Sequence, residues 1–135
     1  LDGREHSLTA TAVSPISLEP PLMLVCVAKK ARFNAAITAA DRWAVSILAE
    51  DGQDAAQWFA TSGRPLEGQM ERVRHSRRPS GLAVLDDSLS WIECRTTRVM
   101  DAGDHDVIVG EVEWASHADG GDPLLYQDGA YRYLR

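Results

Sequence analysis

The sequence predicts a mainly β fold, a barrel of about six or seven strands with two short helices. Residues 90–100 and 107–114 are two long strand-like stretches, and the turn-rich residues 101–105 between them suit a hairpin. Strands of this length are typical of a barrel. Only two segments of the chain have helical spacing, which argues against a doubly wound parallel sheet because that fold alternates strands with helices.

The N-terminal part of the chain predicts two strands joined by a turn. Residues 7–17 alternate between two faces, as in a strand with one packed face, although Pro15 limits how far that strand can pair. Pro20 and Pro21 then force a turn. Residues 22–27 are a short continuous apolar run, which is typical of a central strand buried on both sides.

A basic loop, a helix and another strand follow along the chain. Residues 28–32 form the loop Ala-Lys-Lys-Ala-Arg, and apolar side chains in residues 33–40 recur at helical spacing. Residues 43–48 predict a strand. Asp51 can cap a second short helix that carries Trp58 on its apolar face.

The remainder of the chain predicts a long loop, a short strand and a second hairpin. Residues 62–80 have no apolar period and contain two prolines and two glycines, so they predict a loop that is either functional or disordered. Residues 82–85 predict one more strand. Residues 123–126 and 131–134 flank a Gln-Asp-Gly-Ala turn and predict the last hairpin.

The composition fits one globular domain, residues 1–135, with 44% hydrophobic and 25% charged residues. No run approaches the roughly 20 apolar residues that span a bilayer, and the first residues do not resemble a signal peptide. We therefore expect a cytoplasmic protein that does not associate with membranes. Cys26 and Cys94 lie in apolar runs without paired spacing, which favours buried free thiols over a disulfide or a zinc site.

The net charge of −6 disfavours nucleic acid as a partner, because an acidic protein repels the phosphate backbone. One cluster of basic residues stands out within the predicted loop. Its members are Arg64, Arg72, Arg74, Arg77 and Arg78. Two interpretations stay open: a solvated loop face, which is the usual outcome for a run of charges, and a basic rim that attracts an anionic substrate.

The basic loop at residues 29–32 is a candidate anion site. It lies between a predicted buried strand and a predicted helix, so the first N–H groups of the helix and the basic side chains point at the same place. A phosphate suits such a site, and a solvated basic turn without a ligand is an equally good interpretation. The small side chains and hydroxyls of residues 9–12 would let a flat ring approach the backbone.

Other catalytic motifs are absent from the sequence, including nucleophile elbows, paired cysteines, zinc-protease helices and glycine-rich phosphate loops. Asp104 and Asp106 flank His105, but alternate residues of a strand point to opposite faces, so these residues make a poor metal site. We expect no bound metal. The pattern fits an enzyme whose cofactor carries the chemistry, and it fits a simple binding protein equally well.

Six blocks of sequence, taken together, resemble the flavin reductase domain family. They are residues 9–27, the basic loop, Trp-Ala-Val-Ser-Ile-Leu ending at residue 48, Trp-Ile-Glu-Cys ending at residue 94, Ala-Gly-Asp-His ending at residue 105, and Pro-Leu-Leu-Tyr ending at residue 126. The blocks occur in the family's order and cover nearly the whole chain. The resemblance implies the FMN-binding split β-barrel with Greek-key connections.

The same resemblance implies an NAD(P)H-dependent flavin reductase. It would bind FMN or FAD, take electrons from NADH or NADPH, form a homodimer, and supply reduced flavin to a separate flavin-dependent monooxygenase. Two alternatives stay open. One is a non-catalytic FMN-binding or flavin-storage module, and the other is a related split-barrel oxidase that acts on a substrate such as a pyridoxine phosphate.

The resemblance also implies which residues form the site. His105 would be the catalytic residue, near the flavin and the nicotinamide, and Tyr126 can line the same pocket. The ring and ribityl chain would lie along Thr9, Ala10, Thr11, Ala12 and Ser14, and the phosphate would face Lys29, Lys30, Ala31 and Arg32.

The chain departs from the family pattern at three places. The Phe-containing segment that the family usually has after the second helix is replaced by the arginine-rich residues 64–78. Ala31 and Phe33 stand where the family usually has hydroxyl side chains on either side of the phosphate-loop Arg, and the charge of Lys30 can compensate. The family domain usually has an N-terminal helix and a first strand before the position of Leu1. We therefore expect a single domain that apparently lacks these two elements.

Overall fold

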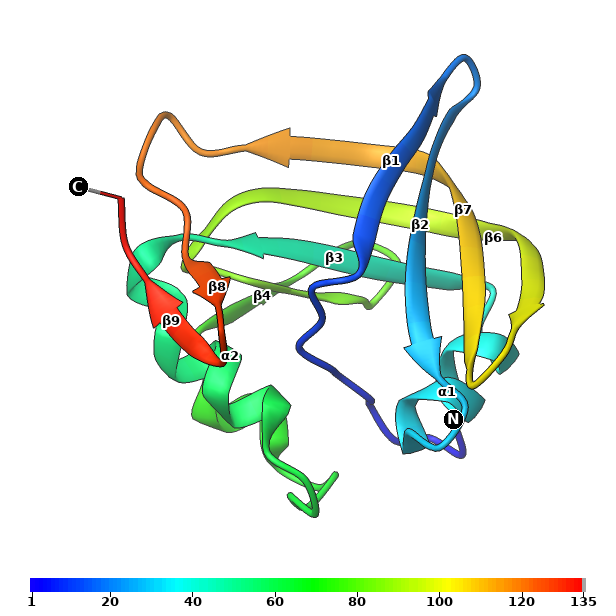
Figure 1. The fold of residues 1–135 in the computed structure, drawn as a ribbon, viewed down its shortest axis with the longest axis horizontal. Coiled ribbons are helices and arrows are strands. Elements are labelled where there is room, and N and C mark those ends of the chain that lie inside the picture. Colours follow the sequence, from blue (N-terminus) through cyan, green and yellow to red (C-terminus); the bar gives the residue numbers. More distant parts are fainter. Residues whose placement is uncertain (135) are drawn as a thin grey trace. The chain divides into compact units, whose positions relative to one another are not determined.

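The computed structural model describes residues 1–134 and contains two compact units, each formed by two stretches of the chain (Figure 1). The first unit consists of Leu1–Trp43 and Glu93–Trp114. The second unit consists of Ala44–Ile92 and the chain from Ala115 onward. No helix among the described residues is long and apolar enough to cross a membrane. The predicted organisation as a single domain stays a prediction.

The described residues form nine strands, two α-helices and two short 3-10 helices. In chain order they are β1 (Val13–Leu18), β2 (Pro21–Ala28), α1 (Arg32–Ala39), β3 (Arg42–Leu48), η1 (Glu50–Gly52), α2 (Gln53–Ala60), η2 (Gln69–Arg72), β4 (His75–Arg77), β5 (Ala83–Leu85), β6 (Ser88–Ala102), β7 (His105–His117), β8 (Leu125–Gln127) and β9 (Ala130–Arg132). The prediction of a mainly β fold with two helices is confirmed, although more strands are present than the six or seven expected.

One five-stranded sheet and two short hairpins organise these strands. The sheet has the order β1-β2-β7-β6-β3, and β4-β5 and β8-β9 each form a two-stranded sheet. Strand β2 pairs antiparallel with β7 over its whole length, from Leu22 opposite Glu111 to Ala28 opposite His105. Figure 1 shows β2 running beside β7 toward α1. The two predicted hairpins, β6-β7 and β8-β9, are therefore both present.

Strand β1 is shorter than the sequence predicts. It begins at Val13 rather than near Ser7, because the Val13 N–H donates to the Thr11 carbonyl at 3.0 Å and turns the chain away from β2. Pairing is irregular between Pro15 and Ser17, where the register shifts, as expected for a residue that cannot donate to a ladder. Residues 7–12 are thus an irregular segment that leads into the sheet.

Strand β2 is an inner strand, as predicted, but it is not equally buried on both faces. Met23, Val25 and Val27 are buried, whereas the residues between them are only partly buried. This alternation follows from the two-residue period of a strand, which directs successive side chains to opposite faces. The continuous apolar run at residues 22–27 therefore has one buried face and one partly accessible face, a difference that its composition does not indicate.

Close packing around Gly110 holds the core of the first unit. The Trp43 indole is buried and its Nε1–H donates to Thr96 Oγ1 at 3.0 Å. A Cβ at Gly110 would lie 2.6 Å from Trp43 Cζ2 and 2.8 Å from Cys94 Cβ. Cys94 is fully buried, and this burial raises the pKa of its thiol to about 12. Both cysteines are free, as predicted, but Cys26 is only half-buried.

In the second unit, helix α2 starts differently from the sequence prediction. Asp51 does not cap it, because η1 precedes the helix and Gly52 occupies the N-cap position without a side-chain hydrogen bond. Gly52 is buried, and a Cβ there would lie 2.9 Å from the Asp87 carbonyl and 3.3 Å from the Leu48 side chain. A close backbone approach therefore fixes this helix start.

The predicted loop at residues 62–80 contains η2 and β4, and two of its arginines are packing residues. Arg64 is buried; its Nε–H donates to Gln69 Oε1 at 3.1 Å and its guanidinium lies 5.3 Å from the centre of the Phe59 ring. The Arg72 guanidinium lies 3.9 Å from the centre of the Trp58 ring. Cation–π contacts of this kind anchor the segment on α2.

Burial removes Arg64 from the exposed cluster that the sequence predicts, whereas Arg72, Arg74 and Arg77 are exposed, so both interpretations stay open for them. Arg74 forms an ion pair with Asp87, and Arg77 donates to the Gly81 carbonyl at 3.1 Å. These contacts tie the segment to its own neighbours in the second unit. A solvated face and a basic rim both required side chains directed into solvent, whereas Arg64 directs its guanidinium inward.

Replacing Gly110 by Ala is expected to destabilise the protein by about 1–3 kcal/mol, as is typical when a methyl group is forced into a packed core. The measurement is the free energy of unfolding in denaturant. A Trp43→Phe change removes the ring atom nearest to the added methyl, so the double variant should lose less than the sum of the two single changes. Strictly additive losses would contradict the packing argument.

Candidate functional site

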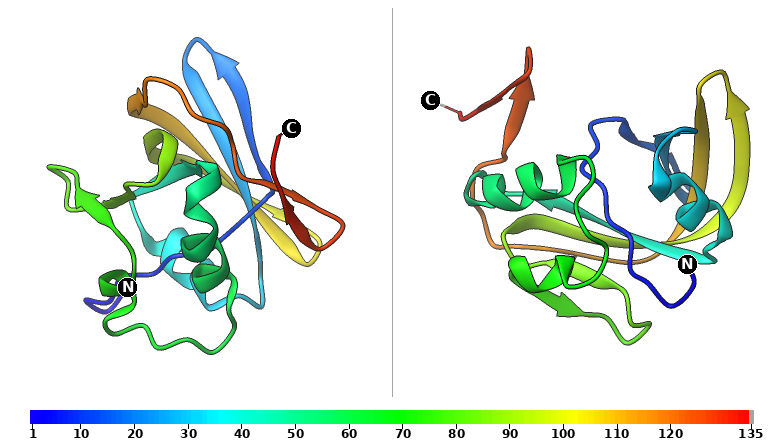
Figure 2. Two further views of the ribbon diagram at one scale, coloured as in Figure 1. Left: turned by 90° about the vertical axis from the view of Figure 1, so that its left-hand side faces the viewer. Right: turned by 90° about the horizontal axis from the view of Figure 1, so that it is seen from below.

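The register of β2 against β7 brings together two segments that are about seventy residues apart in the sequence. Ala28, at the end of β2, lies opposite His105, at the start of β7. The next residue, Lys29, donates its N–H to the Asp104 carbonyl at 2.9 Å. Figures 1 and 2 show α1 beside the turn that joins β6 to β7. The basic loop and the Gly-Asp-His segment are therefore neighbours.

Lys29 directs its charge at the β6-β7 turn. Its Nζ forms an ion pair with Asp101 and donates to the Gly103 carbonyl at 2.7 Å. The sequence prediction placed Lys29 with the residues that face a phosphate. In the structure, its ammonium group already has two acceptors on the neighbouring turn.

Lys30 and Arg32 differ from Lys29, because no partner within the described residues neutralises their charges. Both side chains are exposed, and within residues 1–134 neither makes an ion pair or a side-chain hydrogen bond. They flank Ala31, the N-cap residue of α1, which offers no side-chain cap, and the first turn contains no acidic residue. An uncapped helix start leaves backbone N–H donors available, and anions are stabilised there.

The donor set at this helix start fits a phosphate group. It combines two cationic side chains with backbone N–H groups and no competing carboxylate, which is the usual composition of a phosphate site at a helix N-terminus. Helix α2 provides a contrast, because Glu50, Asp51 and Asp54 lie at or before its first turn. Of the two α-helices in the described chain, α1 is therefore the one suited to an anion.

His105 and Asp104 form a hydrogen-bonded pair at the β6-β7 turn. His105 Nδ1 lies 2.7 Å from Asp104 Oδ1, and the imidazole is about half exposed, at 45%. The hydrogen bond from His105, assisted by its charge, holds the pKa of the Asp104 carboxyl below its usual value. With Nδ1 engaged by Asp104, Nε2 is the ring nitrogen left to face a ligand.

The neighbouring Asp106 is engaged elsewhere. The Asn34 side-chain amide donates to Asp106 Oδ2 at 2.9 Å, which links α1 to β7. Alternation along the strand thus separates Asp106 from His105, as the sequence predicts, whereas Asp104 lies in the turn before β7 and contacts the imidazole, which the alternation argument did not predict. Within residues 1–134 there is no group of three side chains suited to holding a metal.

Two residues of the predicted ring-binding strip, Ala12 and Ser14, lie beside β2. The Cys26 N–H donates to the Ala12 carbonyl at 2.9 Å, and Ser14 lies opposite Leu24. Ala10, Thr11, Ala12 and Ser14 are exposed and Thr9 is partly buried. Ala12 therefore lies beside Cys26, which precedes Ala28, the partner of His105, by two strand positions or roughly 7 Å along β2. Its small side chain leaves the backbone accessible to a flat ring.

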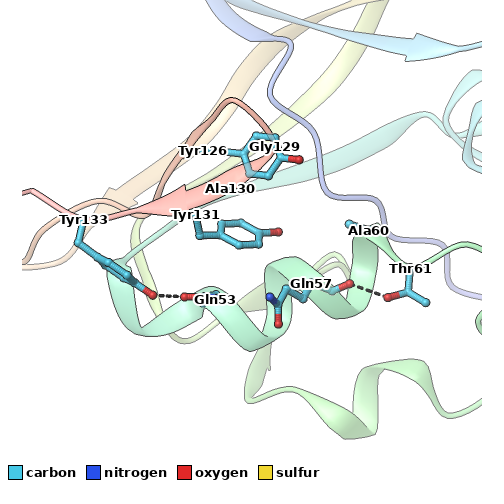
Figure 3. Close-up of a pocket in the computed structure, with 9 residues that line it drawn as sticks. All are labelled: Gln53, Gln57, Ala60, Thr61, Tyr126, Gly129, Ala130, Tyr131 and Tyr133. Atoms are coloured by element: carbon cyan, nitrogen blue, oxygen red, sulfur yellow. Dashed lines mark hydrogen bonds between the residues drawn. The ribbon is translucent and has the colours of Figure 1, made fainter.

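Tyr126 belongs to the second unit, where it lines an open groove. Its ring packs edge-on against Tyr131, with the ring centres 5.1 Å apart (Figure 3). The Tyr133 hydroxyl hydrogen-bonds to the Gln53 side chain of α2. The groove has a volume of about 760 Å³ and is lined by Gln53, Gln57, Ala60, Thr61, Tyr126, Gly129, Ala130, Tyr131 and Tyr133. Sequence reasoning missed it, although three tyrosines in eight residues were a visible signal.

Comparison with known proteins assigns the chain to a family. The model of the flavin reductase like domain matches residues 1–135. The chain belongs to the flavin reductase-like domain family. The resemblance noted from the sequence blocks is therefore confirmed, and the mainly β fold is the one that solved members of this family share.

Two curated relatives and one solved structure illustrate the similarity. The stachydrine N-demethylase reductase subunit of Rhizobium meliloti is 40% identical over 96% of this chain and 54% of that protein. The reductase component of 4-hydroxyphenylacetate 3-monooxygenase from Thermus thermophilus is 35% identical over 99% of this chain and 83% of that protein. The NADH:FAD oxidoreductase of Streptomyces globisporus C-1027 superposes with a TM-score of 0.93 at 29% identity, covering 98% of this chain and 80% of that one.

These relatives differ in length from the chain described. The chain spans about half the length of the first of them. It spans most of the length of the other two. The family is therefore established across residues 1–135, and the activity of the whole protein is treated below as a proposal.

Replacing His105 by Asn is expected to raise the pKa of the Asp104 carboxyl toward its usual value, because the hydrogen bond from the imidazole is the main cause of its lowering. Carbon NMR of the Asp104 carboxyl during a pH titration measures this shift. The matched control is His117→Asn, since His117 Nδ1 contacts only the Ala118 carbonyl. An unchanged Asp104 titration in the His105 variant would show that the pair does not form in solution.

Proposed function

We propose that this protein is an NAD(P)H-dependent flavin reductase that binds FMN or FAD and supplies reduced flavin to a separate monooxygenase. The observation that carries the proposal is the uncapped start of α1, where Lys30 and Arg32 keep their charges available beside His105 and the small-residue strip. Membership of the flavin reductase-like family supports the flavin as the phosphate-bearing ligand.

The phosphate end of the cofactor would be held by charge and by backbone donors. Lys30, Arg32 and the first amides of α1 supply three kinds of donor to a dianion. Ala31 and Phe33 supply no hydroxyl group at this end. The affinity for phosphate then depends more on the two cations than it would in a site that is rich in hydroxyls.

The ring end would lie against the backbone of residues 10–12 and approach His105. When bound, the flavin supplies the redox chemistry by accepting a hydride from a reduced nicotinamide. The protein contributes position: Ala12 leaves space for the ring, and Asp104 fixes the orientation of the His105 imidazole. His105 Nε2 can then hydrogen-bond to the nicotinamide or to the flavin edge. The role of Tyr126, which belongs to the second unit, stays a prediction from the sequence resemblance.

The proposal also includes an oligomeric state, a cellular location and a partner protein. We include a homodimer, which the exposed Ile16 and Leu18 on the edge strand β1 support, since Leu18 is 96% exposed. Two free cysteines support a cytoplasmic location. The relatives named as a reductase subunit and as a reductase component support a monooxygenase partner.

The purified protein should oxidise NADH or NADPH when FMN or FAD is added, measured as loss of the nicotinamide absorbance band. His105→Ala should slow this turnover about tenfold or more, with flavin affinity close to normal, because a misplaced or missing positioning group mainly affects the reacting geometry. Flavin binding without nicotinamide oxidation would favour the storage module instead. Peroxide release from a pyridoxine phosphate would favour the split-barrel oxidase.

Replacing Lys30 or Arg32 by Gln should weaken FMN binding about tenfold, or about 1.4 kcal/mol, and leave riboflavin binding unchanged, because riboflavin lacks the phosphate. Quenching of flavin fluorescence measures both affinities. Arg98→Gln is the matched control, since Arg98 is an exposed cation of the first unit that lies on β6. Equal losses for FMN and riboflavin would contradict the placement of the phosphate.

A further inference from the structure

The three cations of the basic loop have different surroundings. Lys29 is paired with the β6-β7 turn, whereas Lys30 and Arg32 make no ion pair within the described chain. We propose that Lys29 is a positioning residue for His105 and does not bind the phosphate. This inference rests on the proposed function, since it divides the roles within the same site.

Three contacts connect Lys29 to the turn. Its backbone N–H donates to the Asp104 carbonyl at 2.9 Å, its Nζ donates to the Gly103 carbonyl at 2.7 Å, and the same Nζ forms an ion pair with Asp101. The acceptors therefore span the whole turn from the end of β6 to the residue before β7. A single residue, through its side chain and its backbone N–H, restrains both ends of this connection.

The turn needs such a restraint because little else packs against it. Gly103 has a φ of +70°, and a Cβ there would have no neighbour within 4 Å. Asp101 and Asp104 are both largely exposed, at 79% and 91%. Without tertiary packing, hydrogen bonds and charge determine which conformation the turn adopts. The Lys29 side chain provides two of those contacts.

The restraint continues from the turn to the imidazole. Asp104 receives the Lys29 N–H at its carbonyl and holds His105 Nδ1 with its carboxylate. A displacement of the turn therefore moves the group that orients His105. Substitution of Lys29 removes the two side-chain contacts but keeps the backbone hydrogen bond, so the sheet register at Ala28 and His105 is retained.

A phosphate role for Lys29 conflicts with these contacts. The ammonium group would have to leave Asp101, and an unpaired carboxylate would then remain close to the phosphate. Like charges at short range disfavour each other. Lys30 and Arg32 carry no such penalty, since they have no acidic partner to release.

The experiment compares Lys29→Met, which keeps the aliphatic stem, with Lys30→Met and Asp101→Asn. Lys29→Arg serves as the conservative rescue, and Glu111→Gln serves as the matched control. Glu111 forms a comparable exposed ion pair with Arg95, but it lies opposite Leu22, at the other end of the β2-β7 pairing. Each variant is measured for FMN and riboflavin affinity, for nicotinamide turnover, and for the nitrogen NMR chemical shifts of the His105 imidazole at one fixed pH in flavin-free protein.

Lys29→Met should leave the ratio of FMN to riboflavin affinity unchanged, lower kcat/KM for the nicotinamide about tenfold, and change the nitrogen chemical shifts of the His105 imidazole. A tenfold loss of kcat/KM is smaller than the roughly hundredfold loss that a displacement of about 1 Å at a reacting centre can cause. Asp101→Asn should reproduce these changes, the double variant should show no additional loss, and Lys29→Arg should restore the native behaviour. Glu111→Gln should change none of the measurements.

Two outcomes would overturn the inference. One is a lower FMN-to-riboflavin ratio in Lys29→Met that matches the ratio in Lys30→Met, which would make Lys29 a phosphate ligand. The other is a set of His105 imidazole chemical shifts that stays unchanged in both the Lys29 and Asp101 variants. If the unaltered protein binds no flavin, the proposed function fails, but the imidazole chemical shifts still decide whether Lys29 positions His105.

Discussion

The antiparallel pairing of β2 with β7 is the constraint on which the candidate site depends. It is continuous from Leu22 to Ala28 and ends where His105 begins β7. This register places the start of α1 beside the β6-β7 turn, so a cationic helix start and an imidazole share one end of the sheet. Because a shift of one residue would move every side chain to the opposite face, the pairing also determines which residues of β2 are buried.

The way in which positive charge is distributed explains how an acidic protein can offer an anion site. The chain carries a net charge of −6, and much of its basic charge is neutralised or packed locally. Arg42 pairs with Glu113, Arg74 pairs with Asp87, and Arg64 is buried against Phe59. The two cations that flank Ala31 have no such partners within the described residues. Local pairing, and not net charge, therefore decides where an anion is attracted.

Sequence reasoning predicted most elements because local physics determines them. The strand at residues 43–48, the helix after the basic loop and the two hairpins follow from periodicity and turn residues, and each is present. Errors occurred at boundaries. The turn at Thr11 shortened β1, a close approach to Asp87 made Gly52 the N-cap in place of Asp51, and packing on Trp58 and Phe59 ordered the arginine-rich segment. Each of these contacts involves either a residue that is distant in the sequence or a local bend that the amino-acid composition does not indicate.

The sequence by itself determined the mainly β class and the family, because strand periodicity, turn chemistry and short motifs are encoded locally. The set of site residues stays a prediction. The sequence could not distinguish Lys29 from Lys30, which are adjacent and chemically identical. Only the tertiary structure separated them, because their roles depend on a partner, Asp101, that is seventy-two residues away and is brought close by the β2-β7 register. The tertiary structure also engages Asp106 with Asn34 of α1, seventy-two residues earlier, whereas the Asp104–His105 hydrogen bond joins adjacent residues.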